Sequence, residues 1–366
     1  MIAEMVAPMM TKRGLKGTRF SRIEPEFNTS LDGIGWYIHM PFCRRLCTYC
    51  SFRSLAYSPV KIRPYTEALK KEILTYRNKL GRIKCGDVYF GGGTPSLTWR
   101  EVIEVADYLR EEFEIKGEMG MEANPEDIKE EICTPLKQAG ITKISMGMQS
   151  FDTKILERMQ RHYDARQVLT AIELLFNMGF TVSIDLLYGL PGQHVSGLLH
   201  DLKIAAGAGV HHISAYPPDA FPVYQVDENI GAGLSAYTKI GGLFYVNTFF
   251  LREYIKHVEE GLPIATGMTM PPKRVMRRWF MMGLYRSGVE KVEFEKRFGV
   301  TLEQVLGKFL FMLRLLNIIR EHPDRIQVTR KGRYRASLMT KASMINFPGR
   351  YYQECLHHPW PSDFEM

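Results

Sequence analysis

The sequence predicts an α/β protein with a parallel sheet and a smaller, winged-helix-like C-terminal domain. From about residue 33 onward, short apolar strands alternate with amphipathic helices, which is typical of repeated βα units. Beyond about residue 270, two helical patterns precede a short β-rich stretch. A chain of 366 residues can bury one large core and a second, smaller one. The alternation is compatible with an open doubly wound sheet or with a partial barrel.

Six apolar segments are predicted as strands, at 35–42, 86–92, 117–125, 143–150, 182–189 and 211–217. Four amphipathic segments between them are predicted as helices, at 64–80, 99–113, 129–140 and 165–179. Several of these helices end at glycine, the preferred residue just beyond a helix C-terminus. In both parallel architectures the chemistry gathers where strands end, so the loops after the strands are the places to search.

The pattern divides the chain into five parts. They are an N-terminal extension (1–32), the α/β core (33–220), a long helical stretch that completes the core (221–270), the winged-helix-like domain (271–346) and a C-terminal tail (347–366).

Composition narrows the functional classes. No secretory signal and no apolar stretch of membrane-spanning length is evident, so a soluble, cytoplasmic protein is expected. The net charge of +8 favours an anionic ligand, a nucleic acid or an anionic membrane surface, without choosing among them. Six cysteines without an export signal argue against a disulfide framework. Cys85, Cys133 and Cys355 are scattered, and burial is expected for the first two.

The other three cysteines form a motif for metal. Cys43, Cys47 and Cys50 have the spacing C-x3-C-x2-C on a loop just after a predicted strand. A four-iron cubane normally takes four thiolates, so three leave one iron open to the amino and carboxylate groups of S-adenosylmethionine (SAM). The alternative is zinc, with His39 as the fourth ligand of a closed site.

Further motifs follow the cysteines in order: FGGGTPS, EANPE, SMGMQSFD, RMQRH and IDLLYGLPGQ. Together with YIHMPFCRRLCTYCSF they resemble the radical SAM enzymes similar to oxygen-independent coproporphyrinogen III oxidase, over about Tyr37 to Pro217. The resemblance implies a partial (β/α)6 TIM-type barrel of the radical SAM type. It also implies a [4Fe-4S] cluster on the three cysteines that cleaves SAM reductively, with electrons from a reductant such as flavodoxin or ferredoxin.

The resemblance also implies SAM contacts. The turn of Gly92, Gly93 and Thr94 would contact the SAM amino group, and Glu122 would accept from its ribose or ammonium group. A second SAM molecule is expected to contact Gln149, Arg161 and Asp185. Arg161 would pair with its carboxylate, and Asp185 with an amine or a hydroxyl group. The alternative for the last two is a mutual salt bridge.

Three more residues are expected to contact SAM. Tyr37 precedes the cysteine motif and Tyr49 lies within it, so both would flank the cluster and, by resemblance, contact the two SAM molecules. By periodicity alone Tyr37 would be a core strand residue. Asp219 matches a further SAM position by spacing only.

Relatives in the resembled family differ in reaction. In the sequence pattern of coproporphyrinogen III dehydrogenases, a further cysteine follows two residues after the last cluster ligand. This chain has Ser51 and Phe52 in that place. Heme chaperones carry a His-Asn pair followed by Tyr-Trp beyond the barrel, which the stretch 231–242 lacks. Both departures favour a third class, the class C radical SAM methyltransferases, which methylate sp2 carbons of aromatic or polycyclic substrates. The leading expectation is methylation of menaquinone at C8, with porphyrin oxidation or heme chaperoning as the alternative.

Partners are predicted from the same features. A cluster of basic residues beside two aromatic ones would suit a flat, quinone-like substrate drawn from an anionic membrane surface: Lys273, Arg274, Arg277, Arg278, Trp279 and Phe280. The alternative is a Met-rich core with a solvated basic face. A basic chain with a winged-helix-like end also leaves a nucleic-acid-binding module open, although nucleic acid is the less expected partner.

Overall fold

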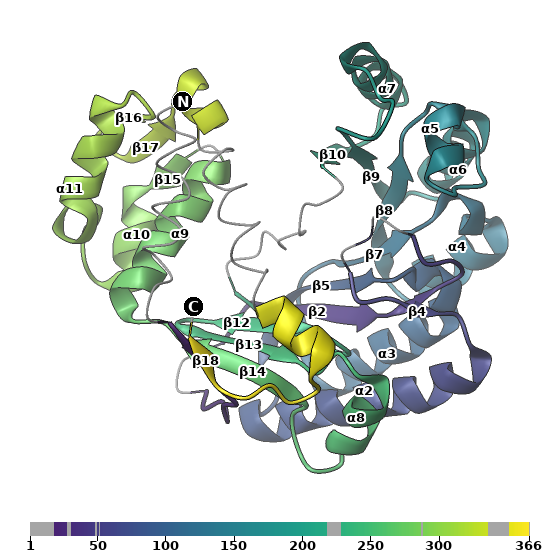
Figure 1. The fold of residues 1–366 in the computed structure, drawn as a ribbon, viewed down its shortest axis with the longest axis horizontal. Coiled ribbons are helices and arrows are strands. Elements are labelled where there is room, and N and C mark those ends of the chain that lie inside the picture. Colours follow the sequence, from purple (N-terminus) through teal and green to yellow (C-terminus); the bar gives the residue numbers. More distant parts are fainter. Residues whose placement is uncertain are drawn as a thin grey trace.

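The computed structural model describes residues 18–27, 31–47, 50, 52–217, 228–286, 288–335 and 351–365. Within these ranges an eleven-stranded sheet forms the body of the larger domain (Figure 1). A separate three-stranded sheet belongs to the C-terminal domain.

The parallel half of the large sheet carries the predicted βα units. Its strands are β2 (Ile34–Met40), β5 (Lys84–Gly92), β7 (Met119–Ala123), β8 (Ile141–Gln149), β9 (Thr181–Leu187) and β10 (His212–Tyr216). They lie side by side in this order, and every neighbouring pair is parallel. The short β6 (Glu114–Ile115) pairs with the start of β5. The predicted partial (β/α)6 barrel is therefore confirmed.

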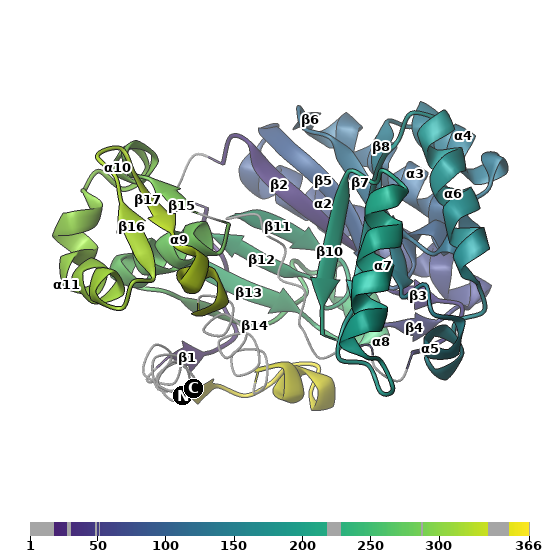
Figure 2. The same cartoon turned by 90° about the horizontal axis from the view of Figure 1, so that it is seen from above.

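Helices cover the outer face of these strands (Figure 2): α2 (Pro59–Leu80), α3 (Trp99–Glu112), α4 (Glu130–Gln138), α5 (Thr153–Arg158), α6 (Ala165–Asn177) and α7 (Val195–Gly207). Each buries an apolar stripe, as α3 does with Val102, Val105 and Leu109 at helical spacing. In α7 the buried Asp201 instead accepts from the Ser150 hydroxyl (2.7 Å) and the Phe151 N–H (2.9 Å), which fixes this helix to the end of β8.

The predicted helical stretch 221–270 is wrong in its described part. Strands and one short helix lie there: β11 (Asn229–Ala232), β12 (Tyr237–Ile240), β13 (Leu243–Asn247), α8 (Leu251–His257) and β14 (Ile264–Thr269). β11 pairs parallel to β2, and β12 to β14 continue the sheet antiparallel. The two glycines between β12 and β13 make the hairpin turn, with Gly241 at φ +57°. Aromatic and β-branched residues on both sides favour strands over a helix.

The C-terminal domain has the predicted winged-helix-like arrangement. Three helices pack on an antiparallel sheet of strand order β15-β17-β16: α9 (Pro272–Arg286), β15 (Gly288–Glu290), α10 (Lys291–Phe298), α11 (Leu302–Leu315), β16 (Ile319–Glu321) and β17 (Arg325–Val328). The predicted wing ends at Val328, and residues 330–335 are helical. Phe280 is fully buried in this core, and the partly buried Trp279 packs against Phe294.

Segments near the two chain ends lie together beside the antiparallel half of the sheet (Figure 2). β1 (Arg19–Phe20) pairs antiparallel with β18 (Phe364–Glu365). The ring of Phe20 stacks on Phe364 (5.1 Å between centroids) and on Tyr351 (5.9 Å), which belongs to a helix at 351–357. The tail therefore closes back over the larger domain.

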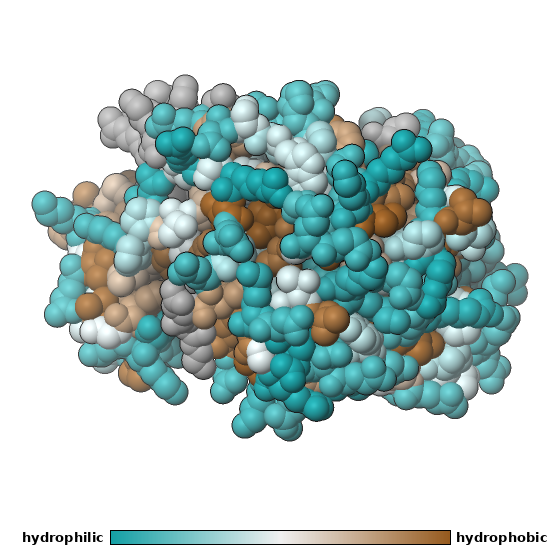
Figure 3. Space-filling view, turned by 90° about the horizontal axis from the view of Figure 1, so that it is seen from below, coloured by the Kyte–Doolittle hydropathy of each residue, from teal (hydrophilic) through white to brown (hydrophobic). Residues whose placement is uncertain are grey.

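The outer surface agrees with an aqueous environment on the face drawn in Figure 3, where hydrophilic side chains predominate and apolar ones gather in smaller patches between them. Among the described residues, no helix has the length and apolar character needed to cross a bilayer.

Candidate cluster and SAM site

The cysteine loop leaves the barrel where β2 ends. β3 (Phe42–Cys43) and β4 (Leu55–Ala56) pair in parallel and bracket the loop. Two backbone hydrogen bonds close it, from the Leu55 N–H to the Pro41 carbonyl (2.7 Å) and from the Tyr57 N–H to the Cys43 carbonyl (2.8 Å). All three cysteines of the motif therefore lie at the mouth of the barrel.

The three thiols are close enough to influence one another. The pKa of the Cys50 thiol is raised to about 11, chiefly by burial, and Cys43, Cys47 and Glu122 contribute to this rise. Burial also raises the pKa of Cys43, while Arg161 lowers it. Because Cys50 as a whole residue is exposed, this burial concerns the surroundings of its sulfur. Metal binding at these thiols would release their protons.

The geometry does not favour the zinc alternative. Among the described residues, no group of three or more His, Cys, Asp or Glu side chains is arranged around a single ion, which holds for the three cysteines as much as for a zinc site and does not distinguish the two. The distinction rests on His39. Both ring nitrogens of His39 are already bonded, Nδ1 to the Tyr37 hydroxyl and Nε2 to the Arg53 carbonyl, each at 3.0 Å. Burial lowers the pKa of His39 to about 4, so its ring is neutral and Nε2 carries the proton that the carbonyl accepts. His39 holds the cysteine loop to β2.

The glycine turn after β5 packs directly on the cysteine loop. A Cβ on Gly92 would lie 2.5 Å from the His39 ring, and one on Gly93 would lie 2.6 Å from the Pro41 carbonyl carbon. The Gly93 N–H donates to Met40 (2.8 Å), and the Thr94 hydroxyl donates to the Cys43 sulfur (3.6 Å). The turn thus positions the first cysteine.

Glu122 is the acceptor at this turn. The Gly92 N–H donates to its Oε2 at 3.0 Å, so this N–H is engaged within the protein. An ammonium group donates hydrogen bonds, and its partners here would be carbonyl and carboxylate oxygens rather than N–H groups. Glu122, which also acts on the pKa of Cys50, fits the predicted role at the SAM amino group.

Gln149 carries two features of a ligand site. It ends β8 with φ +73°, a left-handed conformation that is strained for a residue with a side chain. Its buried Oε1 has no hydrogen-bond partner among the residues that the structure describes. A buried acceptor without a partner costs about 1–3 kcal/mol. A ligand that donates a hydrogen bond to Oε1 would remove this cost, and the polar groups of SAM fit that requirement.

Arg161 and Asp185 do not form the mutual salt bridge that was the alternative reading. The Arg161 guanidinium donates to Asn124 Oδ1 at 2.9 Å and acts on the pKa of Cys43. Asp185 is bonded to Ser145 and Ser214, and burial raises its pKa to about 6. Arg161 thus faces the cysteine loop, where a ligand carboxylate would reach it.

Two residues of this mouth were not predicted. Asn124 follows Glu122 by two positions and orients Arg161, and its place in the EANPE motif was the signal that could have found it. Tyr89 lies between Glu122 and Asp185, since burial and then both carboxylates raise its pKa. Alternation along β5 could have indicated that Tyr89 points inward. The predicted residues Tyr49 and Asp219 lie outside the described residues.

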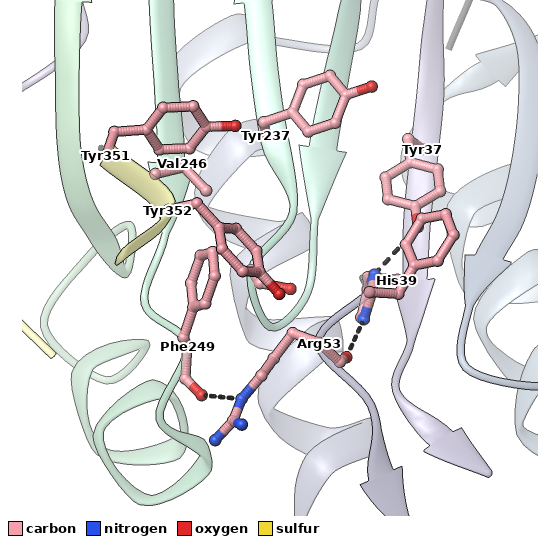
Figure 4. A pocket seen from close by; sticks show the side chains of 10 residues that line it. Tyr37, His39, Arg53, Tyr237, Val246, Phe249, Tyr351 and Tyr352 are labelled. Carbon is pink, nitrogen blue, oxygen red and sulfur yellow. Dashed lines mark hydrogen bonds between the residues drawn. The ribbon is translucent and has the colours of Figure 1, made fainter. Parts of the chain in front are cut away.

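An aromatic slot lies beside the cysteine loop (Figure 4). Its walls come from β2, the end of the cysteine loop, the β12–β13 hairpin and the C-terminal helix: Tyr37, His39, Phe52, Arg53, Ser235, Tyr237, Val246, Phe249, Tyr351 and Tyr352. The cavity that remains between them is about 30 Å³, the room of a water molecule. Tyr37, expected at SAM, is buried in β2 and contributes its ring to this slot.

Arg53 is the cation of the slot. Its Nε donates to the Phe249 carbonyl at 3.0 Å (Figure 4). In the described part of the chain, no carboxylate forms a salt bridge with Arg53. The positive charge therefore lies at the edge of the slot without an acidic partner among those residues, and it would attract an anionic group of a ligand.

Comparison with known families agrees with this site. Residues 37–204 match the radical SAM superfamily, and residues 270–335 match the HemN C-terminal domain. The chain is therefore a radical SAM protein with a HemN C-terminal domain, and this superfamily implies a [4Fe-4S] cluster and SAM. The number of SAM molecules remains a prediction.

Individual relatives are more specific. The chain is 25% identical to the heme chaperone HemW of Bacillus subtilis over 361 residues, which cover 81% of this chain and 95% of the relative. It is 36% identical to HemW of Mycobacterium tuberculosis over 192 residues, about half of each protein (50% and 48%). The coproporphyrinogen III oxidase HemN of Escherichia coli superposes with a TM-score of 0.73 at 20% identity, over 86% of this chain and 90% of that one. The structural likeness shows the fold alone.

These relatives change the functional reading. Their names match the porphyrin and heme alternative better than methylation of menaquinone, which gains no support from them. The departures at Ser51, Phe52 and 231–242 separate this chain from the resembled motifs, but they do not outweigh a match along nearly the full length of a heme chaperone.

Proposed function

We propose that this radical SAM protein binds heme in the aromatic slot beside its cysteine loop and acts as a heme carrier. The observation that carries the proposal is the combination of aromatic walls with the Arg53 cation in one slot. Heme presents a flat apolar ring to the walls and anionic propionates to a guanidinium. The HemW names of relatives support the same ligand.

Arg53 also connects the slot to the cluster site. Its carbonyl accepts from His39, and its side chain reaches Phe249 on the far wall. Because Arg53 ends the same loop that carries Cys43, Cys47 and Cys50, a ligand paired with its guanidinium would act on the loop directly. This connection gives a physical route by which heme and the cluster influence each other.

The residues at the barrel mouth have separate tasks. Cys43, Cys47 and Cys50 would hold the cluster, which together with SAM supplies one-electron cleavage of a carbon–sulfur bond. Arg161 would hold the SAM carboxylate, oriented by Asn124. Gln149 accepts a hydrogen bond at Oε1, and Asp185, with a pKa of about 6, accepts from an amine or a hydroxyl when it is ionised.

Hemin titration of the anaerobic, cluster-reconstituted protein tests the proposal. We expect stoichiometric binding, seen as a shift of the heme absorbance. Arg53→Ala should weaken binding by about 10- to 100-fold, because a hydrogen bond to a charged group contributes about 1.5–3 kcal/mol. Arg45→Ala, an exposed arginine on the same loop, is the matched control and should bind as the wild type does. Equal affinity in the two variants would contradict the assignment of the slot.

The methyltransferase reading makes a different prediction. Incubation with SAM, reductant and menaquinone would then produce S-adenosylhomocysteine and 5′-deoxyadenosine together, and the quinone would gain one methyl group. We expect no methylated quinone. If methylation occurred and hemin failed to bind, the heme proposal would be wrong. A nucleic-acid-binding module would instead show an affinity for nucleic acid that falls steeply as the salt concentration rises.

A further inference from the structure

The inference concerns residues 351–365, which we call the tail plug, and it rests on the proposed heme site. We propose that the tail plug competes with heme for the walls of the aromatic slot, so that heme enters only when the plug moves out. The tail plug lies outside both the radical SAM match and the HemN C-terminal match, which end at residues 204 and 335.

The tail plug supplies two walls of the slot. Tyr351 and Tyr352 enter it from the C-terminal helix, opposite Tyr37 and His39 of β2 (Figure 4). The Tyr352 ring packs edge-to-face on Phe249 with centroids 5.1 Å apart, and Tyr351 packs in the same way on Phe244 at 5.8 Å. These contacts cover apolar surface of β13 and the residues that follow it, which a flat ligand would otherwise cover.

Tyr352 also reaches toward the cluster end of the slot. Burial raises its pKa, and the residue is near enough for Arg53 to lower that pKa and for Cys50 to raise it. The side chain therefore lies near both the proposed heme cation and the third cysteine. With Tyr352 in this place the cavity is about 30 Å³, which excludes a porphyrin.

The far part of the tail plug is held by several exposed contacts and by one buried ring, Phe364. The Arg19–Asp363 pair (2.7 Å) involves side chains that are 75% and 45% exposed, and such pairs contribute little. The Arg22 guanidinium lies 4.8 Å above the Trp360 ring, and the His257 ring lies 4.7 Å from it. β18 joins β1 through only two residues. Trp360 and the buried Phe364, whose ring stacks on Phe20, thus fix this end of the plug to the larger domain.

A ligand can displace the plug because it replaces the contacts that the plug gives up. Phe249, Val246 and Tyr237 remain covered in both states, first by Tyr351 and Tyr352 and then by the heme ring. Heme binding must offset the free energy of exposing the plug's own buried side chains to water, chiefly Tyr351 and Cys355. Heme affinity is then reduced by the fraction of molecules in which the slot is closed.

Hydrogen exchange with and without hemin tests the displacement in the cluster-reconstituted full chain. We expect amides of 351–357 to exchange at least about tenfold faster when hemin is bound, because they leave their packed position. Amides of α11, in the other domain, serve as the control and should not change. If hemin binds and the exchange of 351–357 stays the same or slows, the tail is a fixed wall and the proposal is wrong.

A variant with a weakened tail contact tests the same displacement through the association rate of hemin. Trp360→Ala should increase the association rate of hemin by about five- to thirtyfold, because the open state becomes more populated. Gln353→Ala, an exposed residue on the plug's own helix, is the matched control and should associate at the wild-type rate. Equal rates for wild type and Trp360→Ala would overturn the proposal.

The plug and the heme site can fail separately. If hemin binds neither the wild type nor Trp360→Ala, the proposed function fails, and the plug is then judged by the release of cluster iron to a chelator. Trp360→Ala should lose iron faster than Gln353→Ala, since the slot opens beside Cys50. Equal iron release in that case would overturn the plug as well.

Discussion

The two halves of the large sheet place their buried polar groups differently. In the parallel half, Gln149 Oε1 is buried without a partner in the described part of the chain, and Asp185 is held where burial raises its pKa to about 6. In the antiparallel half, the buried Glu72 of α2 accepts from Tyr254, the Gly233 N–H and Asn247 at 2.5 to 2.8 Å. The antiparallel half also contains a buried oxygen without a partner among the described residues, Asn247 Oδ1, but the Asn247 amide donates to Glu72. The halves therefore differ in where their polar groups lie: at the barrel mouth in the parallel half, and behind an aromatic wall in the antiparallel half.

The largest effect expected in the parallel half is loss of the cluster. Cys47→Ala should abolish the iron–sulfur absorbance of the reconstituted protein, because two remaining thiolates do not retain a cubane. Cys85→Ala, a buried cysteine outside the motif, should keep the absorbance. An intact cluster in Cys47→Ala would show that this loop is not the iron site.

In the antiparallel half, a substitution at Glu72 should lower the stability of the fold. Glu72→Ala leaves the Tyr254 hydroxyl, the Gly233 N–H and the Asn247 amide without their common acceptor, and we expect a loss of about 3–5 kcal/mol in the free energy of unfolding. Urea denaturation at fixed pH measures it. A loss below about 1 kcal/mol would show that this network does not support the wall.

Glu72 also predicts a pH dependence. Burial raises its pKa from 4.5 to about 7 in the folded protein, so the folded state binds the proton more tightly than the unfolded state does. The stabilisation from this proton is complete below about pH 4.5 and is lost as the pH rises to about 7. Glu72→Gln should flatten the decrease over this range. Glu114→Gln should leave it unchanged, because Lys116 lowers the pKa of that half-buried carboxylate, which therefore titrates below this range.

A smaller effect at Gln149 separates binding from stability. Gln149→Gly removes both the unpartnered acceptor and the strain of a positive φ, so we expect the melting temperature of the SAM-free protein to rise. The same change should weaken SAM binding by about tenfold, the equivalent of one hydrogen bond. Unchanged SAM affinity, measured by calorimetry, would remove Gln149 from the site.

The smallest expected effects concern two glycines. Gly241→Ala should destabilise the protein by about 1 kcal/mol, because the hairpin turn between β12 and β13 needs φ +57° there. Gly307→Ala, inside α11 with no atom within 4 Å of a new Cβ, should stabilise it by about 0.5–1 kcal/mol. The same sign for both substitutions would contradict the turn.

The sequence was informative where local pattern and tertiary structure agree. Each parallel strand is a short apolar run followed by an amphipathic helix, so the barrel could be predicted. The stretch 233–261 contains enough helix-forming residues to suggest a helix. The Gly241–Gly242 pair within it is the signal for a hairpin turn. In this stretch, pairing with a neighbouring strand overrides the local preference.

The same distinction holds for the site. Cys43, Cys47, Cys50, Glu122 and Arg161 could be found because each belongs to a short sequence motif, at or after the end of a strand for the cysteines and Glu122 and after α5 for Arg161. The aromatic slot could not, because Arg53, Tyr237 and Tyr352 come from three segments far apart in the sequence. The C-terminal tail gave no periodic or motif signal for its place beside the cysteines, which depends on packing against β13 and β14.

The position of the tail also has a consequence for the order of assembly. The cysteine loop is synthesised about 300 residues before Tyr352, which at roughly 5–20 residues per second corresponds to about 15–60 s. Throughout that interval the slot has no Tyr351 or Tyr352 to narrow it. Iron and sulfide can therefore reach the nascent cysteine loop through an opening that the finished chain keeps closed.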